Sequence, residues 1–256
     1  MKNPKSTMKS KYLIVAALLG ASVSSHADWV AGRDMIANEK PDGPQELLNP
    51  NSTVPEWSYG YRFALQSQSL TLFTSSEHTN SLLGIYDDME GFTSAITVPL
   101  VLVNTGASPV VYDSGYGLLT AVNPGQLDLH PGSFNEYTVV RWTAPTSGSF
   151  AITAFWQDID PYGGDGASGH VLVNGVQVFG QSWANGGGGT IASPLNLNLI
   201  AGDFLDFAVG ANANSDYDNT SFDATITVVP EPSAILLSTI GVLVAAFRRN
   251  RNDRNG

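Results

Sequence analysis

Two segments rich in aspartate, asparagine and glycine carry the residue types that bind hard cations. The segment DIDPYGGDG contributes three carboxylates, which are Asp158, Asp160 and Asp165. The segment NANSDYDNTSFD places amide and carboxylate oxygens at alternate positions, and its candidate ligands are Asn214, Asp216 and Asp218. Calcium takes roughly six to eight oxygen ligands from a turning backbone. Both segments could supply such oxygens, which predicts a structural calcium ion, although neither has EF-hand spacing. The alternative is that Asp and Asn stand here because they favour turns.

Exposed aromatic rings are the second kind of candidate, because flat apolar faces flanked by polar groups suit sugar rings. Trp142 and Trp156 fall within alternating segments and are predicted to be core residues. The residues predicted to be exposed, as a ligand platform, are Trp57, Tyr59, Tyr61 and Trp183. The first three share one side of a predicted strand, and the fourth precedes the glycine-rich segment 185–190. The alternative is that these rings also belong to the core.

The sequence contains none of the motifs that mark common catalytic sites. Between residues 28 and 229 the histidines are His78, His130 and His170, which are far apart in sequence, and the chain has no cysteine. Neither HExxH nor GxSxG occurs. A pair of carboxylates could act as the acid and base of a glycosidase, and that alternative predicts activity that is lost on Asp158→Asn. We predict a protein that is not an enzyme and has no cofactor besides the structural calcium.

The segments that must position the candidate site residues alternate apolar and polar side chains with a period of two. Residues 148–158, 195–199 and 220–229 place apolar side chains at every second position, which predicts half-buried strands. Between two β-branched runs, Asn174-Gly175 predicts a tight hairpin. No amphipathic helical segment longer than about ten residues lies between the two ends of the chain, although α/β proteins need such segments. The predicted fold is therefore all-β, a two-sheet jelly-roll-like β-sandwich over residues 28–228.

The charge of this body excludes one class of partner. Residues 28–229 contain four Lys and Arg against 21 Asp and Glu, a formal net charge of −17. A body this acidic repels phosphates, so nucleic-acid binding is excluded. About 200 residues can bury a core without disulfides, which agrees with the absence of cysteine.

The N-terminus has the three-part pattern of a secretory signal peptide. Four lysines within the first eleven residues precede the apolar run YLIVAALLGA, and SSHA follows with small side chains at Ser25 and Ala27. The pattern predicts a signal peptide over residues 1–27, export through the Sec translocon and cleavage by signal peptidase after Ala27. The alternative is an uncleaved anchor, although roughly ten apolar residues are too few to span a bilayer.

The C-terminus carries an apolar segment between the acidic body and a basic end. Residues 234–247 are uncharged, and the basic residues that follow as a membrane stop are Arg248, Arg249 and Arg251. We predict a short transmembrane helix with its basic end in the cytoplasm, because positively charged flanks stay on that side. As a helix the segment measures about 21 Å, which is short of the roughly 30 Å hydrocarbon core.

A proline-bracketed motif stands directly before this apolar segment: Val229, Pro230, Glu231 and Pro232. Over residues 229–256 the order of motif, apolar helix and arginine cluster resembles the PEP-CTERM sorting signal of Gram-negative bacteria. The resemblance implies recognition by an exosortase, a membrane-embedded cysteine transpeptidase that removes the tail. It also implies transfer to the cell surface or the exopolysaccharide matrix. The alternative is an ordinary tail anchor with an incidental motif.

The body resembles a β-sandwich domain often found ahead of this signal. The matching segments are 49–61, 129–150, 170–175 and 201–220. This resemblance implies a sandwich fold and carries no settled activity. We predict an exported, non-enzymatic binding or structural module associated with exopolysaccharide, anchored in the membrane as a precursor and then located at the cell surface or in the extracellular matrix. The alternatives are the polysaccharide hydrolase and a surface protein that self-assembles through its sheet edges.

Overall fold

The computed structural model describes residues 28–36, 56–73, 75–78, 89–93, 98–113, 119–160 and 163–230. The signal peptide predicted for residues 1–27 lies outside these ranges. The apolar segment 234–247, the arginines after it and two motif residues, Glu231 and Pro232, also lie outside them. Within the described ranges, no helix is long and apolar enough to cross a membrane.

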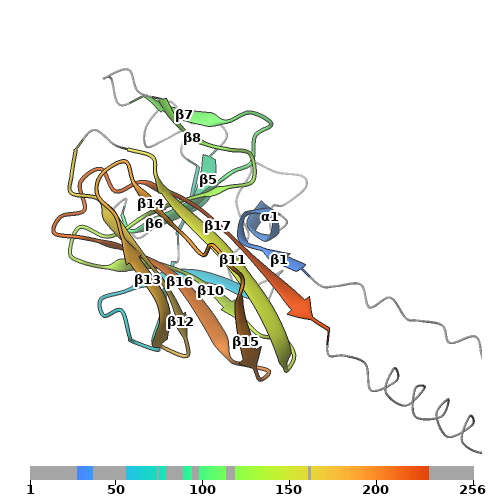
Figure 1. Cartoon of the computed structure of the whole chain (residues 1–256). Coiled ribbons are helices and arrows are strands. Elements are labelled where there is room, and N and C mark those ends of the chain that lie inside the picture. Colours follow the sequence, from blue (N-terminus) through green and yellow to red (C-terminus); the bar gives the residue numbers. More distant parts are fainter. Residues whose placement is uncertain are drawn as a thin grey trace, which may run out of the picture.

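The described residues form two large β-sheets that pack face to face, with a short helix and a two-stranded ribbon (Figure 1). The nine-stranded sheet contains β1 (Asp28–Val30), β4 (Ser75–His78), β5 (Met89–Thr93), β6 (Leu100–Asn104), β9 (Leu127–His130), β11 (Gly148–Asp158), β14 (Gly188–Thr190), β15 (Leu195–Leu199) and β17 (Thr220–Val229). The six-stranded sheet contains β2 (Trp57–Arg62), β3 (Thr71–Leu72), β10 (Tyr137–Thr143), β12 (Ala167–Val173), β13 (Val176–Ser182) and β16 (Phe204–Ala211). The remaining elements are β7 (Val110–Asp113), β8 (Leu119–Val122) and α1 (Ala31–Ile36).

The order of the strands confirms the predicted two-sheet, all-β sandwich. The larger sheet runs β14–β11–β17–β9–β6–β5–β4, with β1 also paired to β17 and β15 to β11. The smaller sheet runs β13–β12–β16–β10–β2–β3. Consecutive strands alternate between the two sheets from β9 to β12 and from β15 to β17, a crossing pattern typical of jelly rolls.

The period-two segments lie where the alternation predicts them. Strands β11 and β17 form a long antiparallel pair, in which Ile152 lies opposite Ile226 and Trp156 opposite Phe222. All four side chains are buried on the inner face of the sandwich. Alternation thus aligns one apolar face along each strand, and the two sheets bury these faces against each other.

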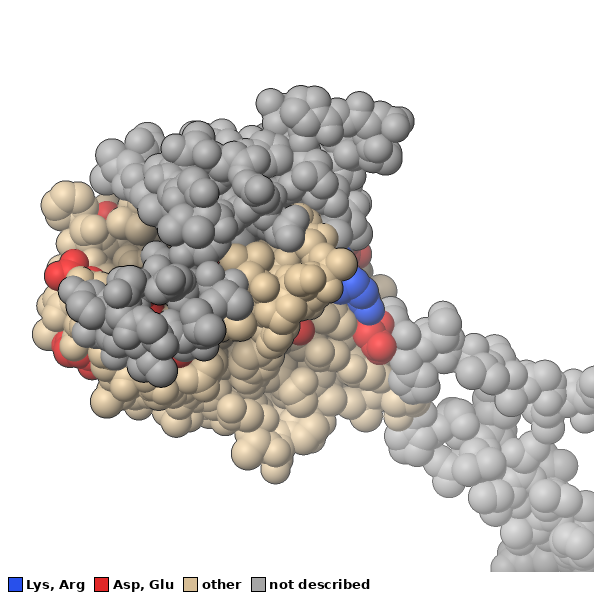
Figure 2. All heavy atoms as spheres, turned by 90° about the horizontal axis from the view of Figure 1, so that it is seen from above, with Lys and Arg blue, Asp and Glu red and all other residues tan. Residues whose placement is uncertain are grey.

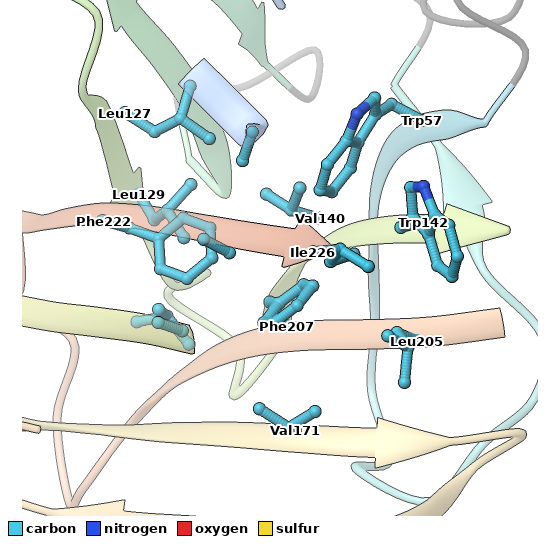
Figure 3. Close-up of a cluster of buried hydrophobic side chains, with 14 of the residues drawn as sticks. Trp57, Leu127, Leu129, Val140, Trp142, Val171, Leu205, Phe207, Phe222 and Ile226 are labelled. Carbon is cyan, nitrogen blue, oxygen red and sulfur yellow. The ribbon is translucent and has the colours of Figure 1, made fainter. Parts of the chain in front are cut away.

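Large aromatic side chains fill the space between the sheets (Figure 3). Trp142 and Trp156 belong to this core and are buried, which confirms the prediction for both. The ring of Trp142 meets Phe150 at 5.2 Å between centroids, and Trp156 stacks on Phe179 at 5.7 Å. Burying a large apolar side chain stabilises the fold by about 2–3 kcal/mol, so this aromatic core makes a large contribution to stability.

The predicted hairpin connects β12 to β13. Asn174 and Gly175 have φ angles of 50° and 82°, the left-handed values that a two-residue turn requires. The Asn174 side chain donates to Oδ1 of Asp203 at 2.9 Å and accepts from the backbone N–H of Phe204 at 3.0 Å. Those bonds tie the hairpin to the start of β16.

Candidate functional site

Four connections meet at one end of the sandwich. They are residues 131–136, 159–160 with 163–166, 183–187 and 212–219, and this end of the molecule is called the loop end below. Backbone bonds join the connections: Ile159 donates to the carbonyl of Asn219, and Asp158 donates to the carbonyl of Gly187, both at 2.8 Å. Acidic side chains gather on the left-hand end of the space-filling view, where these connections lie (Figure 2). The two Asp-rich segments of the sequence therefore belong to one site.

Three of the predicted calcium ligands hold the backbone of the loop end in place. The carboxylate of Asp158 accepts N–H groups from Asp160 at 2.9 Å and from Gly186 at 2.7 Å. Asp165 accepts from Ala213 at 2.7 Å and from residue 214 at 3.3 Å. The side chain of Asn214 accepts the N–H of residue 216 at 3.0 Å. Asp158, Asp165 and Asn214 thus make the turn-stabilising bonds that the alternative interpretation anticipated.

Asp218 is different, because its carboxylate is buried and unpaired. The residue is 1% exposed, and neither carboxylate oxygen has a hydrogen-bond partner among the described residues. Burial, together with the negative charges of Asp165, Asp158 and Asp216, raises the pKa of Asp218 to about 7. The Asp218 carboxylate is therefore a buried negative group at the loop end that has no positively charged or hydrogen-bonding partner among the described residues.

Asp160 shares part of this character. It is 5% exposed, and its Oδ1 has no hydrogen-bond partner within the described ranges. Burial raises its pKa, the nearby charge of Asp158 raises it too, and a side-chain hydrogen bond from Asn219 acts in the opposite direction. Asp160 also lines an open cavity.

Sequence reasoning missed a further buried carboxylate, Asp128 in strand β9. Burial raises its pKa to about 7, the charge of Asp160 adds to this, and a hydrogen bond from the backbone of Thr220 opposes it. Its Oδ1 is unpartnered in the described part of the chain. The alternation in LDLH points Asp128 away from the main core. That face is covered by a second apolar cluster that includes Leu102 and Ile159, which no local pattern reveals.

These acidic side chains approach one another without forming a ready-made metal centre. Across the described ranges, no three or more Asp, Glu, His or Cys side chains converge on one point. Any cation at the loop end would therefore need main-chain or amide oxygens besides one or two carboxylates. Calcium accepts such mixed oxygen ligands, whereas zinc prefers imidazole and thiolate groups.

A polar cavity of about 480 Å³ opens between three of these connections. The residues that line it are His130, Ser133, Asp160, Ser215, Asp216, Tyr217 and Asn219. Burial lowers the pKa of His130, and its Nδ1 lies 2.6 Å from the carbonyl oxygen of Pro131. The neutral ring therefore donates from Nδ1 and presents Nε2 as an acceptor.

Tyr217 gives this cavity an aromatic wall. Its side chain is 46% exposed, and its φ of 65° is a left-handed value that is uncommon for a bulky residue. The ring packs over Gly163, where a Cβ atom would lie only 2.5 Å from Cδ2 of the tyrosine. Glycine at 163 thus permits the position of the ring. A tyrosine inside an Asn- and Asp-rich turn was the sequence signal that could have identified this wall.

The predicted aromatic platform is wrong for three of its four members. Trp57, Tyr59 and Trp183 are buried, and only Tyr61 is partly exposed. The side chains on this side of β2 face the opposite sheet, and Trp57 Nε1 donates to Oδ2 of Asp34 at 3.0 Å. The glycine-rich segment closes over Trp183, where the nearest ring atom would lie 3.2 Å from a Cβ on Gly189.

Comparisons with known proteins add little to this picture. No family model matches the chain, and no curated protein matches it. A family 35 carbohydrate-binding module from Clostridium thermocellum is 17% identical and covers 48% of this chain and 100% of its own, with a TM-score of 0.27. The CBM51 of Clostridium perfringens GH95, in complex with methyl-galactose, is 10% identical. The match covers 60% of this chain and 100% of that module, with a TM-score of 0.31. Pika GITRL is 15% identical, and the match covers 37% of this chain and 75% of that protein, with a TM-score of 0.27. Likenesses this weak carry no argument, so the fold rests on strand pairing and the function on the site.

Proposed function

We propose that this protein is an exported, non-enzymatic binding module whose loop-end cavity holds a neutral glycan of the extracellular polysaccharide. The observation that carries the proposal is the cavity itself, which is open, polar and bordered by the exposed ring of Tyr217. Its volume of about 480 Å³ falls within the range of small-ligand sites.

The groups in the cavity match a polyhydroxylated ligand. Asp160 and Asp216 accept hydrogen bonds, the Asn219 amide both donates and accepts, and Ser133 and Ser215 carry hydroxyls. A sugar hydroxyl is likewise both donor and acceptor, so it can pair with each of these groups. The Tyr217 ring adds an apolar surface for a sugar face.

The charge of the molecule favours neutral over acidic sugars. Two carboxylates border the cavity, and residues 28–229 carry a formal net charge of −17. A uronate would meet like charges that are incompletely screened near a partly buried site. The proposal is therefore a neutral sugar unit within the polymer.

The two ends of the chain support export and surface sorting. Residues 1–27 have the signal-peptide pattern read by the Sec translocon and signal peptidase, and residues 229–256 resemble a PEP-CTERM signal read by an exosortase. Strand β17 ends at Val229, which is the first residue of the motif, so the motif overlaps the end of the last described strand. The intact mass of protein recovered from cells tests this part. A species beginning at Asp28 and lacking the tail is expected, and retention of both ends would contradict sorting.

Binding is tested with the full chain in mild detergent against its producer's polymer and an array of neutral and uronic-acid glycans. We expect saturable binding to a neutral glycan that weakens about fivefold in Tyr217→Gly, because ring contacts of this kind are worth about 1 kcal/mol. Glycine suits the left-handed φ at this position. The control is Phe63→Ala, which removes an exposed ring that does not line the cavity.

Three results would contradict this function. Absence of binding to every glycan removes the carbohydrate ligand, and equal losses in Tyr217→Gly and Phe63→Ala remove the cavity as its site. Release of sugar products that stops in Asp158→Asn would instead identify a hydrolase. The N–H groups of residue 160 and Gly186 bond to different oxygens of Asp158, and an amide has only one oxygen, so one of these bonds is lost in the variant. The loss of activity therefore identifies a hydrolase only if the variant keeps the urea midpoint of the unmodified chain.

A further inference from the structure

The loop end contains buried negative charge that the described part of the chain does not neutralise. Asp218 is 1% exposed with both carboxylate oxygens unpartnered there, and three further aspartates act on it electrostatically. The arginines of the described residues pair elsewhere: Arg33 with Asp34, and both Arg62 and Arg141 with Asp206. A carboxylate in such surroundings either holds a proton or acquires a cation from solution.

We propose that a calcium ion binds at the loop end, between residues 163–166 and 212–219, with the Asp218 carboxylate as its main anionic ligand. This inference does not depend on the glycan proposal, because Asp218 does not line the cavity. It also assigns different roles to the acidic residues. Asp158 and Asp165 accept backbone N–H groups that hold the loops, and their negative charges attract the cation. Asp218 instead provides two carboxylate oxygens that form no hydrogen bond with the described residues.

Three features favour calcium over other metals. The chain has no cysteine, and no cluster of three acidic or imidazole groups stands preformed in the described ranges, so a zinc site lacks its usual ligands. Magnesium demands near-octahedral geometry and keeps several waters. Calcium tolerates an irregular set of carboxylate, amide and main-chain oxygens, which is what two adjoining turns supply.

The ion would join the two segments that form the cavity. Ile159 already donates to the carbonyl of residue 219, and Asp165 accepts from the N–H of Ala213. A cation bound to Asp218 also attracts the neighbouring carboxylates, and this attraction offsets the repulsion between them. We therefore expect the loop end to gain order and the whole fold to gain stability when calcium is bound.

Thermal unfolding of the full chain in mild detergent tests the site directly. At a Ca²⁺ concentration about 100 times the dissociation constant, the Tm is expected to rise by about 5–10 °C over the value in EDTA, and Mg²⁺ at the same concentration is expected to give a smaller shift. Equal Tm values in Ca²⁺ and EDTA would overturn the proposal, as would an equal response to both metals.

Two matched variants locate the ion. Asp218→Asn is expected to abolish the calcium shift while its Tm in EDTA equals or exceeds that of the unmodified chain, because the variant removes an unpaired buried charge. Asp128→Asn removes a similar buried carboxylate with an unpartnered oxygen and should keep the full shift. A calcium shift that survives in Asp218→Asn, or that vanishes equally in both variants, contradicts the assignment.

A direct binding signal covers the case in which a variant fails to fold. Terbium occupies calcium sites and emits when a nearby aromatic ring transfers energy to it, and Tyr217 adjoins Asp218 in the chain. The unmodified full chain is expected to show sensitised Tb³⁺ emission that excess Ca²⁺ displaces. Absence of this emission, or emission that calcium leaves unchanged, would overturn the proposal without any variant.

Discussion

Two fully buried aspartates show how differently two regions of this molecule treat negative charge. Asp206 in β16 is 0% exposed and receives Arg62 at 2.7 Å and Arg141 at 2.6 Å. Asp218 at the loop end is 1% exposed, and its carboxylate receives no hydrogen bond within the described residues. The smaller sheet therefore neutralises its buried charge with its own arginines. At the loop end, the buried charge of Asp218 is neutralised by a cation from solution, as proposed above.

Removing the charge from Asp206 should have the largest effect on stability. Asp206→Asn leaves the buried Arg62 guanidinium without its counter-charge, so the free energy of unfolding is expected to fall by about 3–5 kcal/mol. Urea denaturation in EDTA measures this change, and Asp218→Asn under the same conditions should show no loss. If the two variants lose equal stability, the contrast between the two regions is wrong.

Replacing Gly163 tests the geometry of the loop end. In Gly163→Ala the new methyl group would lie 2.5 Å from the Tyr217 ring, so the ring must move, at an expected cost of about 1–3 kcal/mol. We expect weaker glycan binding as well, because the ring borders the cavity. Gly148→Ala is the control, since its Cβ would meet nothing nearer than 3.9 Å. Matching urea midpoints and glycan affinities in the two variants would show that Gly163 does not position the ring.

Asp223 in β17 is an intermediate case with a smaller expected effect. Burial raises its pKa to about 6; N–H bonds from Gly32 and Ala224 and the charge of Arg33 oppose this, and the charge of Asp34 adds to it. In the unfolded chain this pKa is about 3.9. The folded state thus holds the proton more tightly, and this contribution to stability falls as pH rises from about 4 to 6.

The variant Asp223→Asn should remove that pH dependence. Compared with the unmodified chain, the variant is expected to be more stable by about 1–2 kcal/mol at pH 7, after allowance for partial exposure, and equally stable below pH 4. Urea denaturation at the two pH values measures both differences. A gain that is the same at both pH values would mean that the charge of Asp223 is not its source.

The strands could be predicted from the sequence because alternation is a local property. Residues 148–158 and 220–229 form β11 and β17 with their apolar faces buried, as the pattern indicates. The same pattern does not reveal which side of a short strand faces the other sheet, and this is why Trp57 and Tyr59 were assigned to the surface. Sheet packing across the whole chain decides that choice.

The candidate site could be predicted only in part. The two Asp-rich segments were recognised by composition, and their convergence depends on β11 and β16 ending, and β17 beginning, at the same edge of the sandwich. Composition could not distinguish Asp165, which bonds to backbone N–H groups, from Asp218, which is unpaired. Asp128 escaped notice because its burial comes from a distant segment that covers the outer face of β9.

Calorimetric titration of calcium into the full chain tests most directly whether solution supplies the charge that the loop end lacks. We expect one calcium ion to bind per unmodified chain and none per Asp218→Asn chain. A folded Asp206→Asn chain is expected to bind one calcium ion. No bound calcium in the unmodified chain, or one ion retained in Asp218→Asn, would contradict this proposal.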